Sequence, residues 1–395
     1  MKDTSSRPEA AWRVPSLGVD QLLGCRGTRV IDLRSPAEFA EDHVPGACNL
    51  PLFDDLERAL VGTIYKRRSP AEAFDRGVEL LESRIVPLVA EIAECAGRPA
   101  PEADLVALLE RLTAAGLDRI NRALETAPAA ELPEGALLLY CWRGGLRSSS
   151  VVVLLRELGW RDVFVLEGGY KGYRRHVMNE LEAWGPPPVF VLRGRTGVGK
   201  TLVLRELEAR VPGLTLDLEG LAGHRSSILG MVGLEPCPQK TFDSRLATRL
   251  RAGFPGRLVV EGESRKVGDT ILPRSVWEAL QGGVNLQLEA PVEHRVQVLI
   301  DDYLAREENR DELRAQLPFI EGRLGQRRWR GELVRLLDER RDAELVEVLL
   351  ERYYDPLYAH SEEGRSCAAT FDTSDLDRVV AELVAWLDRA RLPAH

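Results

Sequence analysis

One short motif restricts the fold of the second half of this sequence more than any other feature. Residues Gly194 to Thr201 match the pattern G-x-x-x-x-G-K-S/T. The apolar run Val189–Arg193 before the motif predicts a strand, and the segment Leu202–Ala209 after it predicts a helix. A strand, a glycine-rich turn and a helix in this order form a phosphate-binding loop. Later segments also alternate between strand and helix patterns, so we expect an α/β domain with a parallel sheet.

The residue types of this motif fit phosphate binding. Backbone amides of residues 197–201 are expected to surround a phosphate, with Lys200 reaching its charge and Thr201 holding Mg²⁺. The predicted phosphate-binding set is Gly194, Gly197, Gly199, Lys200 and Thr201. Glu261 directly follows the predicted strand Leu258–Val260, where proteins with such loops place an acidic residue near the metal. An ordinary polar strand end is an equally good interpretation, so the sequence alone assigns no metal ligand.

A second glycine-rich turn lies in the first half of the chain, between Cys141 and Ser150. The apolar run Leu137–Tyr140 leads into it, and the apolar-periodic segment Val151–Leu158 leads out. This order again predicts a strand, a loop and a helix, with Cys141 as the first residue of the loop.

The composition of this second loop favours an ionised cysteine and a bound anion. Its glycines let successive N–H groups point toward one centre, and the helix start adds the positive end of its dipole. Such surroundings lower a cysteine pKa from about 8.5 to roughly 3.5–7.5. The predicted anion-binding residues are Arg143, Gly144, Gly145 and Arg147. We interpret Cys141 as a nucleophile, although a free cysteine is more often a small buried hydrophobic residue.

Two domains are expected from the length of 395 residues. Gly185 to Pro188 ends a helical pattern with three prolines, which form a stiff spacer. The predicted boundaries are therefore 12–184 for the first domain, 185–188 for the linker and 189–395 for the second domain. A helical insertion is predicted in the first domain at about 70–126, with a kink at Pro87. The second domain is predicted to contain a strand at Leu214–Leu218 and to be helical from about Val292 to the end.

Composition excludes several classes of protein. The chain is 44% hydrophobic and 29% charged, as soluble globular proteins are, and no apolar run is long enough to span a membrane. Met1–Trp12 lacks the apolar core of a signal peptide, so we expect a cytoplasmic protein without a membrane partner. Its 6 cysteines contain no C-x-x-C pair, which argues against a disulfide framework or a zinc site. The net charge of −9 argues against a generally basic nucleic-acid binder.

Several strings of the first half resemble a rhodanese domain, the sulfurtransferase fold. They are Asp32 to Phe39, His43 to Ala47, the Cys141 loop and Glu167 to Tyr170. Combined with the phosphate-binding loop, the chain resembles the bacterial tRNA 2-selenouridine synthase family over nearly its whole length. Further strings carry this resemblance, namely Glu57 to Lys66, Asp217 to Arg225 and Tyr353 to Tyr358.

The resemblance implies an N-terminal rhodanese-like domain followed by a P-loop NTPase-like domain with a helical C-terminal part. It implies replacement of sulfur by selenium at C2 of the wobble 2-thiouridine in tRNAs for Lys, Glu and Gln. Selenophosphate would be the donor, Cys141 the nucleophile that carries the selenium, and an enzyme that supplies selenophosphate a candidate partner. The family is also associated with geranylation of the thiouridine sulfur from geranyl diphosphate. The P-loop would hold that diphosphate or a nucleotide, with Mg²⁺ as a candidate ion and no certain cofactor.

The chain departs from the family pattern in two places. Family members carry Glu-Asp-Glu-Ser-Arg where this chain has Glu261 to Arg265, with Gly262 in place of the aspartate. If that aspartate served a metal or substrate, Glu261 or Glu263 would do its work, and both are candidates for an acidic site. Family members also carry His-Arg-Gly-Ser where this chain has Ser226 in place of the glycine.

Two other functions fit parts of the sequence. Cys141 to Arg147 satisfies C-x₅-R, the spacing with which cysteine phosphatases surround a phosphate. No histidine precedes Cys141 and no evident general acid follows it, which argues against a phosphatase. The second alternative is a P-loop RNA-binding regulator whose rhodanese-like domain does not catalyse. The intact loop residues around Cys141 argue against this alternative.

Overall fold

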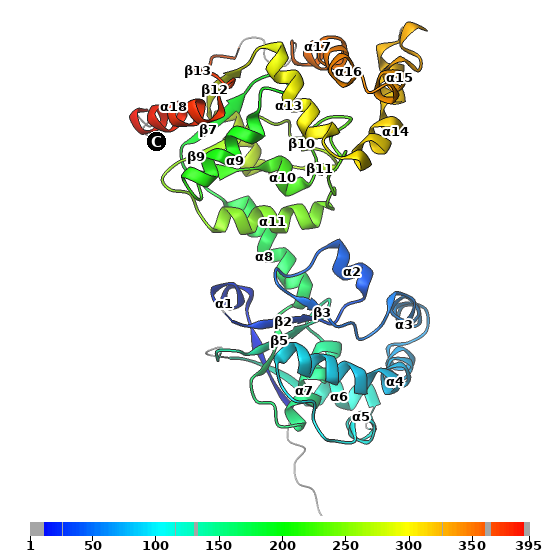
Figure 1. Ribbon diagram of the computed structural model, residues 1–395. Helices are drawn as coiled ribbons and strands as arrows, with labels where there is room; N and C mark the ends of the chain where they lie inside the picture. The colour runs from blue at the N-terminus through cyan, green and yellow to red at the C-terminus, as the bar shows by residue number, and fades with distance from the viewer. Residues whose placement is uncertain are drawn as a thin grey trace, which may run out of the picture. The chain divides into compact units, whose positions relative to one another are not determined.

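The computed structural model describes residues 12–25, 27–114, 116–129, 133–325, 327–359 and 365–390. Residues 1–11, where we expect no signal peptide, lie outside the described residues. So do residues 391–395, the end of the predicted second domain. The chain divides into two compact units, residues 1–179 and 180–395. This division falls inside helix α8, Gly169–Ala183, ahead of the proline-rich segment 185–188 (Figure 1).

The first unit is built on a six-stranded sheet with the order β3-β2-β5-β6-β1-β4, in which all pairs are parallel. Its strands are β1 Trp12–Leu17, β2 Arg29–Asp32, β3 Cys48–Asn49, β4 Leu124–Pro128, β5 Leu137–Tyr140 and β6 Val163–Leu166. Every residue of the central strands β5 and β6 is buried. Such continuous apolar strands are typical of a parallel sheet covered on both faces.

Eight helices of the described chain surround this sheet. They are α1 Val19–Gly24, α2 Pro36–Glu41, α3 Asp55–Arg67, α4 Pro70–Ala96, α5 Leu105–Thr113, α6 Gly116–Ala123, α7 Leu146–Glu157 and α8. Helix α4 has one apolar face, on which Ile85, Leu88 and Ile92 are fully buried in the core, and this agrees with the helical pattern predicted for this segment. Helix α4 runs on past Pro87.

The predicted helical insertion at about 70–126 has its expected start, because α4 begins at Pro70, but an additional helix precedes it and its last helix ends before residue 126. Helices begin earlier, with α3, which the apolar pattern missed because none of its side chains is buried. They end at Ala123, and β4 then pairs with β1 from Leu124, opposite Trp12. Strand β4 is the edge strand of the sheet and β1 is its inner neighbour. The two strands are far apart in the sequence, so their pairing leaves no signal in either segment alone.

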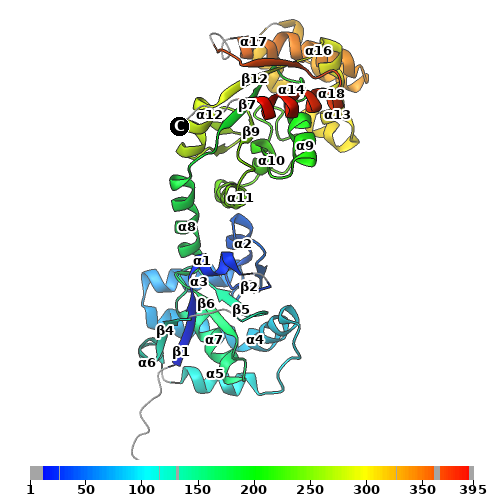
Figure 2. The same cartoon turned by 90° about the vertical axis from the view of Figure 1, so that its left-hand side faces the viewer.

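The second unit contains a five-stranded parallel sheet with the order β13-β12-β7-β9-β8 and a separate hairpin, β10-β11. The strands are β7 Val189–Arg193, β8 Thr215–Leu216, β9 Leu258–Glu261, β10 Lys266–Val267, β11 Thr270–Ile271, β12 Val284–Glu289 and β13 Ala369–Asp372. The helices are α9 Lys200–Arg210, α10 Leu218–Ala222, α11 Gln239–Arg251, α12 Arg274–Gly282, α13 Val292–Leu304, α14 Glu307–Leu324, α15 Glu332–Asp338, α16 Asp342–Leu349, α17 Asp355–Ala359 and α18 Leu376–Arg389. Figure 2 shows α9 and α18 near the strands of this sheet, and their apolar residues share one core with β7 and β12.

Two predictions in the second unit are wrong. The region after Val292 is not all helical, because β13 pairs with β12 at the edge of the sheet. The predicted strand Leu214–Leu218 is shorter, because Leu218 begins α10. Asp217 caps that helix, with its carboxylate accepting a hydrogen bond of 2.6 Å from the Gly220 N–H.

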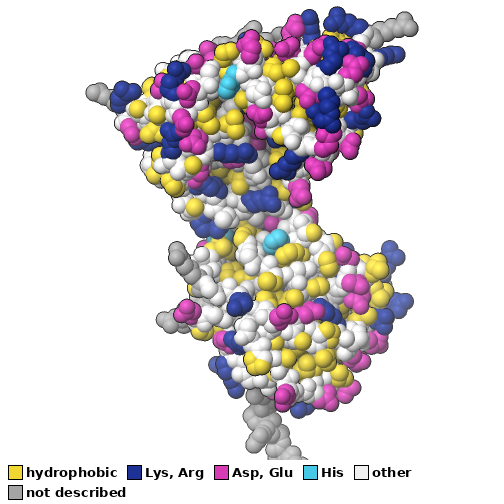
Figure 3. All heavy atoms as spheres, in the orientation of Figure 1, with side chains coloured by type: hydrophobic (Ala, Val, Ile, Leu, Met, Phe, Trp, Pro, Cys, Tyr) yellow, Lys and Arg dark blue, Asp and Glu magenta, His cyan; other side chains and the backbone are white. Residues whose placement is uncertain are grey.

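Each of the two sequence motifs follows a strand at the carboxyl edge of its sheet. Cys141 comes directly after β5, and Gly194 comes directly after β7. This edge is where parallel α/β sheets bind ligands. On the face drawn in Figure 3, basic and acidic side chains are interspersed over both units. Within the described part of the chain, no helix combines the length and apolarity required to cross a membrane.

Candidate active site and phosphate-binding loop

Cys141 lies in a loop that surrounds its sulfur with hydrogen-bond donors. The loop runs from the end of β5 to the start of α7, and Cys141 is only 3% exposed. The Ser148 hydroxyl, on the first turn of α7, lies 3.3 Å from the Cys141 sulfur. Backbone N–H groups of Ser148 and Arg143 also hydrogen-bond to this sulfur.

These donors favour the thiolate form. Burial by itself raises the pKa of Cys141, since a charge is costly in a low dielectric. The positive charge of Arg147, the Ser148 hydroxyl and the two backbone N–H groups outweigh burial, and the pKa of Cys141 is lowered below its ordinary value. An ionised, polarisable sulfur with inward-facing donors can act as a nucleophile on an anionic substrate.

The predicted anion-binding residues contribute in different ways. Arg147 is half-buried and supplies charge, whereas the Arg143 side chain is exposed and this residue bonds to the sulfur through its backbone. Gly144 has a φ of +64°, and a Cβ there would lie 2.5 Å from the Leu166 carbonyl oxygen. Only glycine fits this position. Gly145 precedes α7 as its N-cap residue.

The loop is held in place by the turn between β6 and α8. The N–H of Tyr170 donates to the Cys141 carbonyl oxygen at 2.9 Å, and the N–H of Lys171 donates to that of Trp142, also at 2.9 Å. A Cβ at Gly169 would lie 2.3 Å from the Cys141 carbonyl oxygen. The Glu167 to Tyr170 string therefore supports the backbone of the cysteine loop.

A buried ion pair supports Tyr170 in turn. The Arg34 guanidinium is fully buried, bonds to the Asp32 carboxylate at 2.6 Å and lies 3.7 Å from the centre of the Tyr170 ring. It also donates to the Asp42 carbonyl oxygen at 2.7 Å, and the Tyr170 hydroxyl donates to the Asp42 carboxylate at 2.9 Å. The Asp32 to Phe39 string thus positions the scaffold of the site, whereas the described residues that act on the sulfur itself are Arg143, Arg147 and Ser148.

The phosphate-binding loop of the second unit has the predicted connection between β7 and α9. Lys200 is half-buried and its Nζ donates to the Gly194 carbonyl oxygen at 2.9 Å. Gly194, Gly197 and Gly199 all have positive φ, and Thr201 lies half-buried in the first turn of α9.

Arg295 on α13 supports this loop from behind. Its Nε donates to the Thr196 carbonyl oxygen at 2.8 Å, and its Nη2 donates to the Asp355 carboxylate at 2.6 Å. A Cβ at Gly197, which has a φ of +81°, would lie 2.8 Å from the Arg295 carbonyl oxygen. Asp355, in the Tyr353 to Tyr358 string, thus acts on the loop through Arg295 and also pairs directly with Arg195 of the loop at 3.6 Å.

Three carboxylates gather at the end of β9. Glu219, Glu261 and Glu263 each place a carboxylate oxygen within 4.8 Å of the others. Burial, together with repulsion from Glu263, raises the pKa of Glu219 to about 7. Burial and neighbouring carboxylates raise the pKa of Glu261 well above its ordinary value, and burial also raises that of Glu263.

The donors around these carboxylates only partly satisfy them. Ser226 donates its N–H to Glu219 at 2.8 Å and its hydroxyl to Glu263, and the charge of Lys200 favours ionisation of both. Glu261 accepts one bond, from the Glu219 N–H at 2.9 Å, through Oε1. Its Oε2 is buried and has no hydrogen-bond partner among the described residues. Crowded oxygen ligands of this kind fit a hard divalent cation.

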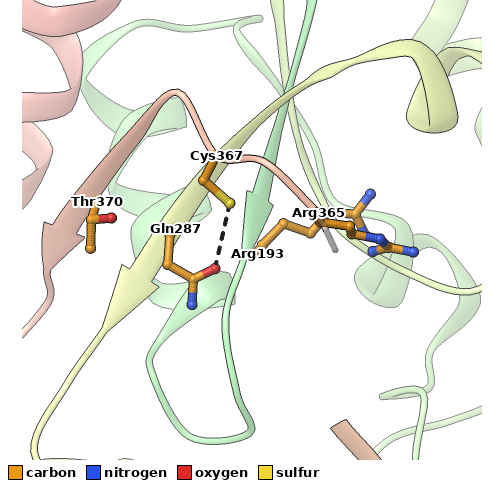
Figure 4. A pocket seen from close by; sticks show the side chains of 5 residues that line it. All are labelled: Arg193, Gln287, Arg365, Cys367 and Thr370. Carbon is orange, nitrogen blue, oxygen red and sulfur yellow. Dashed lines mark hydrogen bonds between the residues drawn. The ribbon is translucent and has the colours of Figure 1, made fainter. Parts of the chain in front are cut away.

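Gly262 leaves room for an arginine side chain. A Cβ at Gly262 would lie 2.5 Å from Nη1 of Arg193, the last residue of β7, which is only 6% exposed. Arg193 Nε donates to the Asn285 side chain at 2.9 Å. The same arginine lines a cavity of about 280 Å³ (Figure 4). The cavity-lining residues are Arg193, Gln287, Arg365, Cys367 and Thr370.

Four residues of these sites were not assigned a role from the sequence. They are Ser148, Arg193, Glu219 and Ser226. The only local signal is at Ser148, which directly follows Arg147 of the C-x₅-R spacing. The contacts of the other three depend on segments brought together by the sheet.

Replacing Ser148 by alanine is expected to raise the pKa of Cys141. The hydroxyl stabilises the thiolate, so its loss moves the midpoint of Cys141 alkylation to higher pH and lowers the alkylation rate below that midpoint. Peptide-level mass spectrometry after alkylation across a pH series measures this. Ser150→Ala on the same helix is the matched control, and an unchanged midpoint in Ser148→Ala would contradict the assignment.

Replacing Gly262 by alanine is expected to lower the free energy of unfolding by about 1–3 kcal/mol, because the new Cβ overpacks against buried Arg193. Combining it with Arg193→Gly should destabilise the protein less than the sum of the two single changes. Denaturant unfolding of the full chain measures both effects. Gly282→Ala is the control, since a Cβ there meets nothing within 4 Å. Strictly additive losses would show that Arg193 and Gly262 are not coupled.

The chain is similar in sequence to proteins of one enzyme family. Residues 187–390 match the family described as the tRNA 2-selenouridine synthase AAA domain. A tRNA 2-selenouridine synthase of Cupriavidus pinatubonensis is 34% identical over 87% of this chain and 92% of its own. Those of Pseudomonas syringae pv. syringae and Sulfurovum sp. are 33% and 31% identical, over 90% and 87% of this chain and 93% and 91% of theirs. The chain therefore belongs to the tRNA 2-selenouridine synthase family, whose members are tRNA-modifying enzymes.

Proposed function

We propose that this enzyme exchanges sulfur for selenium at C2 of the wobble 2-thiouridine in tRNAs for Lys, Glu and Gln. Selenophosphate is the selenium donor, and Cys141 is the nucleophile that reacts with it. The first unit acts as a rhodanese-like domain in this proposal. The observation that carries the proposal is the low pKa of Cys141 in a loop of inward-facing donors.

The chemistry of the donor fits this loop. Selenophosphate is a small anion, and the N–H groups of Arg143 and Ser148 and the charge of Arg147 favour negative charge at the sulfur. Selenium chemistry also needs a polarisable nucleophile, which a thiolate supplies. Selenium released at this loop would be passed on to C2 of the uridine.

The proposal gives the P-loop a separate substrate, geranyl diphosphate. The thiouridine sulfur attacks the first carbon of the geranyl group, a C–S bond forms, and diphosphate leaves with the electron pair of the broken C–O bond. The alkylated sulfur is then a good leaving group when selenium attacks C2. Both donors are already activated, so this scheme needs no ATP.

The second unit offers the groups that a diphosphate requires. Lys200 and the backbone amides of residues 197–201 would bind its oxygens. Glu219, Glu261 and Glu263 would hold a divalent cation, which supplies further charge neutralisation for the diphosphate. The unpaired Oε2 of Glu261 is the contact in this group that a cation would satisfy.

Loss of Cys141 tests the selenium exchange. The full chain is incubated with selenophosphate, geranyl diphosphate and 2-thiouridine tRNA, and the tRNA nucleosides are analysed by mass spectrometry. Cys141→Ser is expected to lower the rate of selenouridine formation by at least about 10³-fold, the scale on which loss of a nucleophile reduces turnover. Cys25→Ser, an exposed cysteine, is the control and should react at the wild-type rate. Equal rates for both variants would exclude Cys141 as the nucleophile.

Loss of Lys200 tests the substrate of the P-loop. Lys200→Ala is expected to weaken binding of geranyl diphosphate by roughly 10- to 150-fold, because a charged hydrogen bond to the diphosphate is lost. Calorimetric titration of the full chain in the presence of Mg²⁺ measures the affinity. Lys66→Ala, an exposed lysine of α3, is the matched control. Unchanged affinity in Lys200→Ala would refute this use of the loop.

A further inference from the structure

The Cys141 loop has the geometry of a site for phosphoryl transfer. Its sulfur is the first position of a C-x₅-R spacing that ends at Arg147, and the next residue, Ser148, places its hydroxyl 3.3 Å from that sulfur. Backbone N–H groups of Arg143 and Ser148 bond to the same atom. A thiolate with two backbone N–H donors, a hydroxyl and the charge of Arg147 acting on it is a suitable nucleophile for a tetrahedral anion bound at the loop.

Electron balance limits what a thiolate can do to selenophosphate. If the sulfur attacks selenium, the Se–P bond must break with its electron pair on phosphorus, and phosphite is released. If the sulfur attacks phosphorus, selenium leaves with the electron pair as selenide, and no atom changes its oxidation state. The second route needs no oxidant or reductant and ends in phosphate.

We infer that Cys141 attacks the phosphorus of selenophosphate, forming S-phosphocysteine and releasing hydroselenide as the nucleophile for C2 of the uridine. This inference rests on the proposed function for the identity of the donor. The S–P bond forms as the Se–P bond breaks, and selenium leaves with the bonding electron pair and the proton that selenophosphate already carries, as the hydroselenide ion HSe⁻. Water then attacks the same phosphorus, the S–P bond breaks, and phosphate and the Cys141 thiolate are regenerated.

Ser148 has a defined task in the second step. The sulfur leaves as a thiolate, and a hydroxyl 3.3 Å away can donate a hydrogen bond to the charge that develops on it. Arg147 favours the same thiolate through its charge. The groups that lower the pKa of Cys141 in the free enzyme therefore also stabilise it as a leaving group.

The surroundings of the sulfur also select the leaving group of the donor. No described carboxyl group or imidazole hydrogen-bonds to Cys141 or Ser148. An alkyl phosphate needs such a group to protonate its departing alkoxide. Hydroselenide, HSe⁻, is a much weaker base than an alkoxide and leaves without this help. The loop is therefore suited to a phosphorus–selenium bond and poorly suited to ordinary phosphate esters, which is how it differs from a general phosphatase.

Isotope labelling distinguishes the two routes. Selenophosphate labelled with ¹⁸O on phosphorus is mixed with the full chain, geranyl diphosphate and 2-thiouridine tRNA, and the reaction is stopped by rapid denaturation. We expect the Cys141 peptide to carry the ¹⁸O-labelled phosphoryl group, and ³¹P NMR to show phosphate as the product. In Ser148→Ala the labelled peptide should persist about 10-fold longer, because the leaving thiolate loses a charged hydrogen bond. Ser150→Ala should decay at the wild-type rate.

Any other result contradicts either this inference or the proposed function on which it rests. A Cys141 peptide with the isotope pattern of selenium and no ¹⁸O, or phosphite as the product, would show attack at selenium. Selenouridine formation with neither adduct on Cys141, in wild type and in Ser148→Ala, would also overturn it. Absence of selenouridine from the wild-type reaction would instead refute the proposed function, so the two failures are distinguishable.

Discussion

Burial of a negative charge on Cys141 is the constraint on which the first unit depends. A thiolate that is 3% exposed is unfavourable unless donors compensate for the lost water. The compensation comes first from the charge of Arg147 and then from Ser148 and the backbone N–H groups of the loop, so the loop must keep one conformation. Two N–H groups of the β6–α8 turn fix its carbonyls, and Gly144 and Gly169 allow the two segments to touch. The reactive atom is thus positioned by main chain more than by side chains.

The second unit must instead keep positively and negatively charged groups close together. Its loop exposes N–H groups and Lys200, while three carboxylates crowd at the end of β9. Lys200 is close enough to both Glu219 and Glu263 to favour their charged forms. A site for a metal-bound phosphate needs both kinds of group. The positive groups would bind the phosphate anion and the carboxylates would bind the metal cation.

Features that depend on residues close together in the sequence were predicted correctly, and features that depend on distant residues were not. Cys141 as the first loop residue and the placement of Gly194 to Gly199 between β7 and α9 were correct, because strand, turn and helix are adjacent in the chain. Strands β1, β4 and β13 were missed, since short strands depend on partners distant in sequence. The role of Glu219 in the carboxylate cluster was not predicted, for the same reason. Glu219 reaches Glu261 only because Asp217 starts a helix beside the end of β9.

In the proposed scheme the two loops bind phosphate groups through the same kind of backbone N–H contacts but differ in the atom at their centre. The first places a nucleophilic sulfur there, so a bound phosphoryl group is held against an atom that can form a bond to it. The second places a lysine, which has no lone pair to donate while it is protonated and bonded to Gly194. A lysine of this kind can bind and stabilise a leaving diphosphate and cannot attack it. The proposal therefore assigns covalent chemistry at phosphorus to the loop of the first unit, and in it the P-loop accelerates a reaction only by stabilising charge on its ligand.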